Sequence, residues 1–205
     1  DVVIFSRSGF TRSPGVSRLF WLGDQVHTWD AYDGLASAVT ATLSGGSSGF
    51  ALTHSDVGGY TSIDHTSFFV QHIFGYAGAP LIRDRELLCR WLESNAFSDS
   101  VLRTHEGLRP RDNHQVWSDA TTLAHFRRFT FVFKAFRPYR RRLMAEAAAH
   151  GWPIARHPVL HYPDDPVLLA DRSASDGGEG RIRQFMLGPD WLIVPVLTAG
   201  ADSVR

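Results

Sequence analysis

The sequence lacks the features of a disulfide-rich, membrane-spanning or strongly basic protein. Cys89 is the only cysteine among 205 residues, which excludes an intrachain disulfide and a zinc site built from cysteines. The best apolar stretch, residues 191–197, is far shorter than the roughly 18 residues of a transmembrane helix. Lys+Arg and Asp+Glu both number 21, and this balance argues against a generally basic nucleic-acid binder.

Lysine and targeting signals are also scarce. Lys134 is the only lysine, which we interpret as coding bias toward arginine. The sequence opens at Asp1 without a recognisable signal peptide and stops in polar sequence at Arg205, so we expect a segment of a longer, cytoplasmic protein. Apolar neighbours around Cys89 favour a buried, inert thiol over a nucleophile.

What the chain has is the composition of a packed protein, and its 43% hydrophobic residues exclude intrinsic disorder. Four short apolar runs each end in a cluster rich in Gly, Arg, Asp or His, at residues 2–5, 19–22, 49–52 and 101–102. Parallel α/β barrels carry their chemistry on the loops that follow the strands. The pattern therefore predicts an α/β fold with four parallel strands, which is half a barrel.

Apolar residues at helical spacing predict helices over residues 35–43, 84–97, 120–139 and 143–150. We expect Asp33 to cap the first helix and Gly45-Gly46 to stop it. Pro138 should kink or split the third helix, and Gly151 should end the fourth. Beyond Gly151, strands at 185–187 and 192–196 around the turn 188–190 predict the start of an all-β domain. Residues 64–80 and 173–180 are expected to be loops.

Two surface predictions concern the third and fourth helices. The apolar stripe of the third helix should pack on the barrel, at Leu123, Phe126, Phe129 or Thr130, Phe133 and Phe136. The run Arg140-Arg141-Arg142 is expected to be a solvated helix face, with a nucleic-acid or membrane patch as the alternative.

Two aspartates at predicted strand ends are candidates for acid–base chemistry. Asp24 follows Trp21 closely, and apolar surroundings favour the protonated form that a general acid needs. Asp56 stands before Gly58-Gly59, which permit a tight turn or close approach of the backbone to a ligand. A capping or turn-forming role is the alternative for each. Because glycosidases use two carboxyl groups, the residues alone would pair Asp24 with Asp56.

Arg103 and His105 are two residues apart at the end of the last run, so their side chains should point to the same side. Both could donate hydrogen bonds to hydroxyl groups or an anion, and a structural ion pair is the alternative. No metal is predicted, because His54, His105 and the aspartates lack a metal-ligand spacing. The absence of a Gly-x-Ser-x-Gly elbow argues against a serine hydrolase triad.

A series of short motifs follows one order along nearly the whole chain. They are Arg7-Ser8-Gly9-Phe10, Trp21-Leu22-Gly23-Asp24-Gln25, Ser48-Gly49-Phe50, His54-Ser55-Asp56-Val57-Gly58-Gly59-Tyr60, Arg90-Trp91, Arg103-Thr104-His105-Glu106-Gly107, Arg109-Pro110, Asp112-Asn113, Tyr162-Pro163-Asp164-Asp165-Pro166, Leu187-Gly188-Pro189-Asp190 and Val194-Pro195-Val196. In this series the sequence resembles glycoside hydrolase family 31, the α-glucosidase family, and is most similar to its sulfoquinovosidase branch.

The resemblance implies a retaining α-glycosidase on a (β/α)8 TIM barrel. Residues 1–150 would form the C-terminal half of that barrel, and residues 151–205 the start of a β-sandwich domain. Asp24 matches the acid/base catalyst of the family. Asp56 matches a carboxylate that binds sugar hydroxyls, so the resemblance removes it as a nucleophile. The other positions that match substrate-binding residues are Arg7, Trp21, Tyr60, Arg103 and His105, with Tyr60 near the sulfonate in sulfoquinovosidases.

The family nucleophile matches no residue of this chain, because it belongs to a strand before Arg7. We therefore predict that the isolated segment is inactive. We also expect it to fold poorly alone, because a half-barrel exposes apolar edges. The expected partner is an α-glycoside, with no cofactor, nucleic acid or membrane, and no oligomeric state is predicted. The alternatives are a neutral α-glucosidase or α-xylosidase of the same family, or a degenerate carbohydrate-binding protein.

Overall fold

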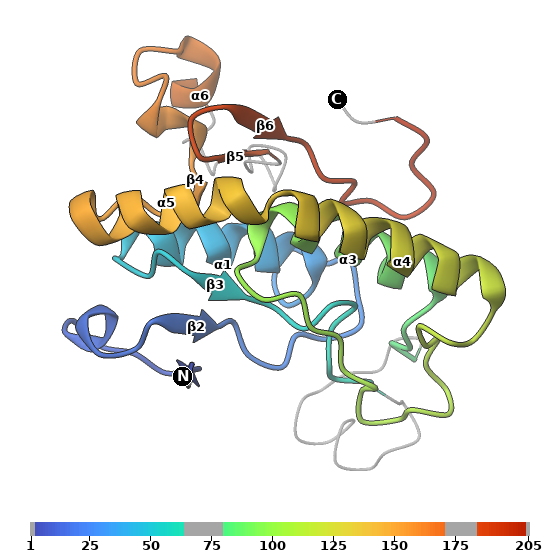
Figure 1. Ribbon diagram of the computed structural model, residues 1–205. Coiled ribbons are helices and arrows are strands. Elements are labelled where there is room, and N and C mark those ends of the chain that lie inside the picture. Colours follow the sequence, from blue (N-terminus) through green and yellow to red (C-terminus); the bar gives the residue numbers. More distant parts are fainter. Residues whose placement is uncertain (1–2, 64–79, 171–183, 204–205) are drawn as a thin grey trace.

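Two small sheets lie on opposite sides of a layer of helices in the computed structural model (Figure 1). The structure describes residues 3–63, 80–170 and 184–203. The first sheet is parallel, with β1 (Phe5–Ser6), β2 (Leu19–Trp21) and β3 (Thr53–His54) side by side in that order. The second sheet is antiparallel and comes from the C-terminal part of the chain. The mixed α/β architecture and the parallel pairing agree with the sequence prediction.

The parallel strands differ from the predicted apolar runs at their ends. Val3 and Ile4 are exposed and lie outside β1, so the prediction of a buried strand over residues 2–5 is wrong; Val2 itself lies outside the described residues. No described element pairs with β1 on its far side. β3 begins at Thr53, later than the run 49–52, although the Leu52 carbonyl already accepts a hydrogen bond from Phe20 N at 3.0 Å.

The fourth predicted strand is reduced to one bridge. Residues 101–102 form no strand, and the only parallel pairing in this stretch joins Thr104 to Val57. The Ser100 amide donates to the Thr53 carbonyl at 3.0 Å, so the segment still runs beside β3. A two-residue run with a described partner on one side only makes too few ladder hydrogen bonds for a regular strand.

Helix α1 (Leu35–Ser47) runs through Gly45 and Gly46, so the predicted stop at these glycines is wrong. A Cβ on Gly46 would lie 2.9 Å from the Pro153 Cβ, so the missing side chain serves a close approach between helix and chain. The N-cap is Gly34 and not Asp33. The Gly34 amide donates to the Ser37 hydroxyl at 2.9 Å, which closes the helix start without a carboxylate.

Helix α3 (Arg85–Ser98) packs on α1 and on the sheet through an apolar core. Asp84 caps it by accepting a hydrogen bond from Leu87 N at 2.8 Å. The core contains Leu35, Ala38, Val57, Leu87, Leu88, Trp91, Leu92 and Phe126. Cys89 is half-buried, and burial raises the pKa of its thiol, which is consistent with an inert role.

Pro138 splits the long predicted helix into α4 (Ala120–Ala135) and α5 (Arg137–His150), and Gly151 ends α5. Phe126 of the predicted stripe is buried in the core, but Leu123 is exposed, so the stripe does not pack along its whole length. The solvated-face prediction is wrong for Arg140. This side chain is buried and donates to backbone carbonyls, including that of Phe133 at 2.8 Å, while Arg142 is exposed and pairs with Asp190.

The second sheet contains β4 (Ala155–Arg156), β5 (Phe185–Leu187) and β6 (Trp191–Ile193). The hairpin around residues 188–190 is confirmed, with β6 starting at Trp191. Short helices complete the described chain at η1 (Ser13–Gly15), η2 (Pro158–Leu160) and α6 (Pro166–Ala170). The loops predicted at 64–80 and 173–180 fall, except for Pro80, outside the described residues. No described helix is long and apolar enough to cross a bilayer.

Candidate active site

Asp24 lies three residues beyond the end of β2, beside the side chain of Arg7. Arg7 Nη1 is 3.5 Å from Asp24 Oδ2, and the exposed fractions of the two side chains are 57% and 34%. The Arg7 guanidinium also lies over the Trp21 ring, 5.2 Å from its centroid. The structure thus brings together three predicted site residues. The apolar surroundings expected around Asp24 are not found, because a cation and solvent adjoin the carboxylate.

Strand register and alternation explain why Trp21, His54 and Asp56 share one side of the sheet. Successive side chains of a strand point to opposite faces, so residues two apart lie on the same face. In the observed register Trp21 lies opposite His54, and Asp56 continues the His54 face. The parallel bridge between Val57 and Thr104 then sets Arg103 beside Asp56. Predicted residues from separate segments therefore meet at the carboxyl ends of parallel strands, where barrel enzymes carry their chemistry.

Asp56 is far more buried than Asp24, with 1% of its side chain exposed. Its Oδ1 lies 3.3 Å from Arg103 Nη1 and 3.4 Å from His54 Nε2. Its Oδ2 has no hydrogen-bond partner among the described residues. Arg103 covers the carboxylate and is 41% exposed, so it connects the buried anion to solvent. The unpaired buried oxygen is an acceptor that a sugar hydroxyl could satisfy.

His54 and Asp99 form a buried pair behind Asp56 that sequence reasoning missed as functional residues. His54 Nδ1 lies 3.2 Å from Asp99 Oδ2, and both side chains are 1% exposed. Burial alone would lower the pKa of His54, but contacts with Asp56 and Asp99 outweigh it and raise the pKa to about 9. His54 therefore carries a proton at neutral pH. Asp99 directly follows α3, and no motif in the sequence pointed to it.

Tyr60 and His105 lie together on the loops that follow β3 and the Val57–Thr104 bridge. Their ring centroids are 4.4 Å apart in an edge-to-face arrangement. His105 Nδ1 accepts a hydrogen bond from Gly107 N at 3.2 Å, so in the neutral ring the proton is on Nε2. The pair can thus present a phenol and an imidazole N–H as donors. Among the described residues, no group of His, Cys, Asp and Glu could hold a metal ion.

Arg83 was not predicted as a site residue, and its buried side chain holds these loops in place. Its guanidinium is buried and donates to the carbonyls of His105 at 2.8 Å and His114 at 2.9 Å, and to Gln115 Oε1 at 2.9 Å. Burial lowers its pKa to about 10. Gly58 lies against it, since a Cβ there would sit 2.5 Å from Arg83 Cδ. The sequence left a tight turn or close approach to a ligand open for Gly58-Gly59, and their positive φ angles of +84° and +79° support the tight turn.

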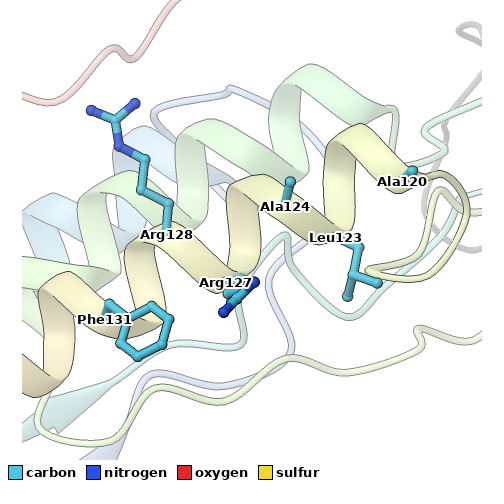
Figure 2. A pocket seen from close by; sticks show the side chains of 6 residues that line it. All are labelled: Ala120, Leu123, Ala124, Arg127, Arg128 and Phe131. Atoms are coloured by element: carbon cyan, nitrogen blue, oxygen red, sulfur yellow. The ribbon is translucent and has the colours of Figure 1, made fainter.

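An apolar hollow lies along the outer face of α4 and contains none of the predicted site residues (Figure 2). Figure 2 shows Leu123, Arg127 and Phe131 along one side of the helix, spaced one turn apart. The hollow is completed by Ala120, Ala124 and Arg128. It offers no convergent polar groups of the kind that orient a small ligand.

Parallel strands with an exposed carboxylate, a stacked Arg–Trp pair and a buried second carboxylate at their carboxyl ends have the arrangement of a barrel glycoside hydrolase. Comparison with known families agrees. Residues 1–145 match the glycosyl hydrolases family 31 TIM-barrel domain. The chain belongs to glycoside hydrolase family 31, and the resemblance found in the sequence is confirmed.

Individual relatives carry a more specific name. The chain is 40% identical to a sulfoquinovosidase of Agrobacterium fabrum and 38% identical to one of Escherichia coli, with 98% and 99% of the chain covered. A solved family 31 sulfoquinovosidase from E. rectale, in complex with the aza-sugar inhibitor IFGSQ, superposes with a TM-score of 0.83 at 34% identity over 98% of the chain. In all three cases the chain spans 26% of the relative's length.

Proposed function

We propose that this chain belongs to a retaining α-glycosidase that cleaves α-sulfoquinovosides. Residues 1–150 would supply the C-terminal half of the (β/α)8 barrel, and residues 151–205 the start of a β-sandwich domain. The change from a parallel to an antiparallel sheet after α5 supports this division. The substrate class is supported by relatives at 38–40% identity that are sulfoquinovosidases.

The observation that carries the proposal is the position of Asp24. Its carboxylate is one-third exposed beyond the carboxyl end of a parallel strand, next to Arg7, whose guanidinium lies over the Trp21 ring. An acid/base catalyst must reach both the leaving oxygen and the attacking water, so it needs this exposure. Asp24 would protonate the leaving oxygen in the first step and take a proton from water in the second.

The remaining polar groups would bind the sugar. Asp56 Oδ2 is an unpaired acceptor for a ring hydroxyl, and the exposed edge of Arg103 is a donor beside it. His105 and Tyr60 extend the donor row along the loops, with Tyr60 toward the sulfonate. Such preorganised groups stabilise charge that develops in the transition state. Arg7 would hold the Asp24 carboxylate between turnovers.

We further propose that residues 1–205 alone do not hydrolyse a glycoside. Retaining hydrolysis needs a nucleophile about 5–5.5 Å from the acid/base group. Asp56 does not offer one, because its carboxylate is buried and engaged by Arg103 and His54. The nucleophile would come from a strand that precedes Arg7 in the full-length protein.

The test of substrate class compares kcat/KM of the full-length protein on an aryl α-sulfoquinovoside and on the matching aryl α-glucoside. We expect at least a tenfold preference for the sulfonate, which corresponds to about 1.4 kcal/mol of transition-state binding. Tyr60→Phe should reduce this preference and leave glucoside turnover nearly unchanged. A preference for glucoside would assign a neutral α-glucosidase, and activity on neither substrate would assign a noncatalytic carbohydrate-binding protein.

A further inference from the structure

A row of four alternating charges runs from the end of α3 to the proposed sugar site. Asp99 contacts His54 Nδ1 at 3.2 Å, and Asp56 Oδ1 contacts Arg103 Nη1 at 3.3 Å. Between these pairs, His54 Nε2 lies 3.4 Å from Asp56 Oδ1, an ion-pair contact without the geometry of a hydrogen bond. The first three side chains are almost fully buried, and only Arg103 reaches solvent. The row is therefore anchored at its inner end and open at its outer end.

The inner anchor is built from more than the imidazole. Asp99 Oδ2 also accepts a hydrogen bond from the Ser55 amide at 3.0 Å, and its Oδ1 accepts one from the Ser98 hydroxyl at 3.0 Å. These bonds tie the carboxylate to β3 and α3. The imidazole ring cannot turn without losing its contact with one of its two carboxylates, and a buried charge that loses an opposite charge is costly.

We propose that His54 is a positioning residue of the glycosidase site. Held by Asp99, its ring fixes Oδ1 of Asp56, which in turn orients Arg103 and leaves Oδ2 available to a sugar hydroxyl. This inference rests on the proposed function, because it assigns the support of the carboxylate that binds the sugar. His54 itself has no exposed edge with which to touch a substrate.

The physical reason for such support is the geometry of a lone carboxylate. Arg103 alone would hold the Asp56 carboxylate by a single contact from a guanidinium that is 41% exposed. A second contact to the same oxygen, Oδ1, removes the rotation that a single contact leaves open. Displacement of a binding group by about 1 Å can cost about 100-fold in rate, because hydrogen bonds that tighten in the transition state are lost.

The charge of the row should depend on pH through His54. The charged groups around it are Asp56, Asp99 and Arg103 in the row, together with two buried cations that act on the carboxylates. Arg83 acts on Asp56, and Arg140 on Asp99. With both carboxylates ionised, the pKa of His54 is raised to about 9. Loss of the proton above that pH would leave two buried carboxylates facing a neutral ring.

The experiment uses the full-length protein and the variants Asp99→Asn and His54→Gln, with Asp190→Asn as matched control. Asp190 is also paired with an arginine, but on the surface. We expect kcat/KM on the aryl α-sulfoquinovoside to fall about 100-fold in both row variants, mainly through kcat. Asp190→Asn should stay within twofold of the parent.

The pH profile separates positioning from general damage. The profile is measured with an aryl α-sulfoquinovoside whose very good leaving group needs little protonation by Asp24, so that the alkaline limb of kcat/KM reports His54. In Asp99→Asn this limb should move to lower pH, because His54 loses one of the two carboxylates that hold its proton. In His54→Gln that limb should be absent. Lower activity with an unshifted alkaline limb in both variants would contradict the proposal, and so would failure of both to fold, which would assign the row to stability alone.

A third measurement does not depend on turnover. In a crystal structure of full-length His54→Gln we expect the Asp56 carboxylate to rotate and its contact with Arg103 to be lost. An unchanged contact near 3.3 Å would overturn the inference whatever the enzyme cleaves. An inactive parent with a displaced carboxylate in the variant would instead reject the proposed function and retain the positioning role.

Discussion

Asp24 and Asp56 follow neighbouring parallel strands, yet their surroundings differ. Asp24 is one-third exposed and pairs, among the described residues, with Arg7, which is itself mostly exposed. Asp56 is 1% exposed and shares one oxygen between Arg103 and His54. A carboxyl group that exchanges protons with substrate and water needs the first environment, and a group that fixes a ligand needs the second. The difference supports the proposal that the two aspartates have separate tasks.

Two buried histidines also differ in their surroundings, here in the charge of their neighbours. His54 lies between carboxylates, which raise its pKa to about 9 against the effect of burial. The pKa of His27 is lowered to about 4, mainly by burial and to a lesser extent by the nearby Arg83 cation. Burial is nearly equal for the two residues. The neighbouring charge therefore decides which histidine is protonated in the folded protein.

The largest expected effect on stability is at Arg83, the buried arginine that holds the site loops. Arg83→Met should lower the free energy of unfolding by about 3–5 kcal/mol, because several buried acceptors lose their donor at once. Arg142→Met removes an arginine that is 68% exposed and paired with Asp190, and should cost less than about 1 kcal/mol. Urea unfolding of the full-length protein measures both, and equal losses would remove the distinction between buried and exposed charge.

A smaller loss of stability is expected at Gly58, in the turn that precedes Tyr60. Gly58→Ala should destabilise the fold by about 2–3 kcal/mol, because φ is +84° and a Cβ would lie 2.5 Å from Arg83 Cδ and 2.7 Å from Leu88 Cδ1. Gly151 has a similar φ of +76° but open space around it, so Gly151→Ala should cost about 1 kcal/mol. Urea midpoints of the two variants separate strain from crowding, and a larger loss for Gly151→Ala would contradict this assignment.

The histidines predict opposite pH dependences of stability. His54 binds its proton more tightly in the folded state, so its contribution is complete below its unfolded pKa of 6.5 and is lost as pH rises toward about 9. His27 binds its proton more weakly in the folded state, so its contribution is complete above 6.5 and is lost as pH falls toward about 4. Each should change the free energy of unfolding by roughly 1–2 kcal/mol across its window.

Urea midpoints at about pH 5, 6.5 and 8.5 test this prediction with two variants. His54→Gln should flatten the alkaline side and His27→Gln the acid side, each relative to the parent. If His54→Gln changed the acid side instead, the assignment of a protonated His54 would be wrong.

The smallest expected effect on stability is at the exposed pair. Arg7→Met should change the free energy of unfolding by less than about 1 kcal/mol, because surface ion pairs contribute little. A loss above about 2 kcal/mol in urea unfolding would show that the Arg7–Asp24 pair stabilises the fold. The distinction between an exposed pair at Asp24 and a buried, structurally held carboxylate at Asp56 would then be wrong.

The sequence predicted what local patterns control. The split at Pro138, the end of α5 at Gly151 and the hairpin at 188–190 depend on backbone restrictions of proline and glycine, and they are confirmed. Gly45-Gly46 failed as a stop because the tertiary contact with Pro153, which lies far along the chain, uses the missing side chain. Arg140 failed as a surface residue because its guanidinium donates to the carbonyl of Phe133 in α4 and to that of Ala96 in the distant helix α3.

For the site, the strand-end clusters predicted that Arg7, Trp21, Asp24, Asp56 and Arg103 lie at the carboxyl ends of the strands, and the structure joins Arg7 to Asp24 and Trp21, and Arg103 to Asp56. The assignment of roles to these residues came from the family resemblance. Asp99 and Arg83 carried no local signal, since Asp99 reaches the site through His54, 45 positions away, and Arg83 through the carbonyl of His105, 22 positions away. The environment of Asp24 was also mispredicted, because Arg7 comes from a separate strand.

The most direct test of the account is the dependence of Asp24→Asn on the leaving group in the full-length protein. An acid catalyst matters most where the leaving oxygen needs a proton, so substrates with poor leaving groups should lose about 100- to 10,000-fold in kcat/KM. Aryl glycosides with very good leaving groups should lose much less, and a small external nucleophile such as azide should restore turnover. Equal loss on both substrate types, without rescue by azide, would contradict the role of Asp24 as acid/base catalyst.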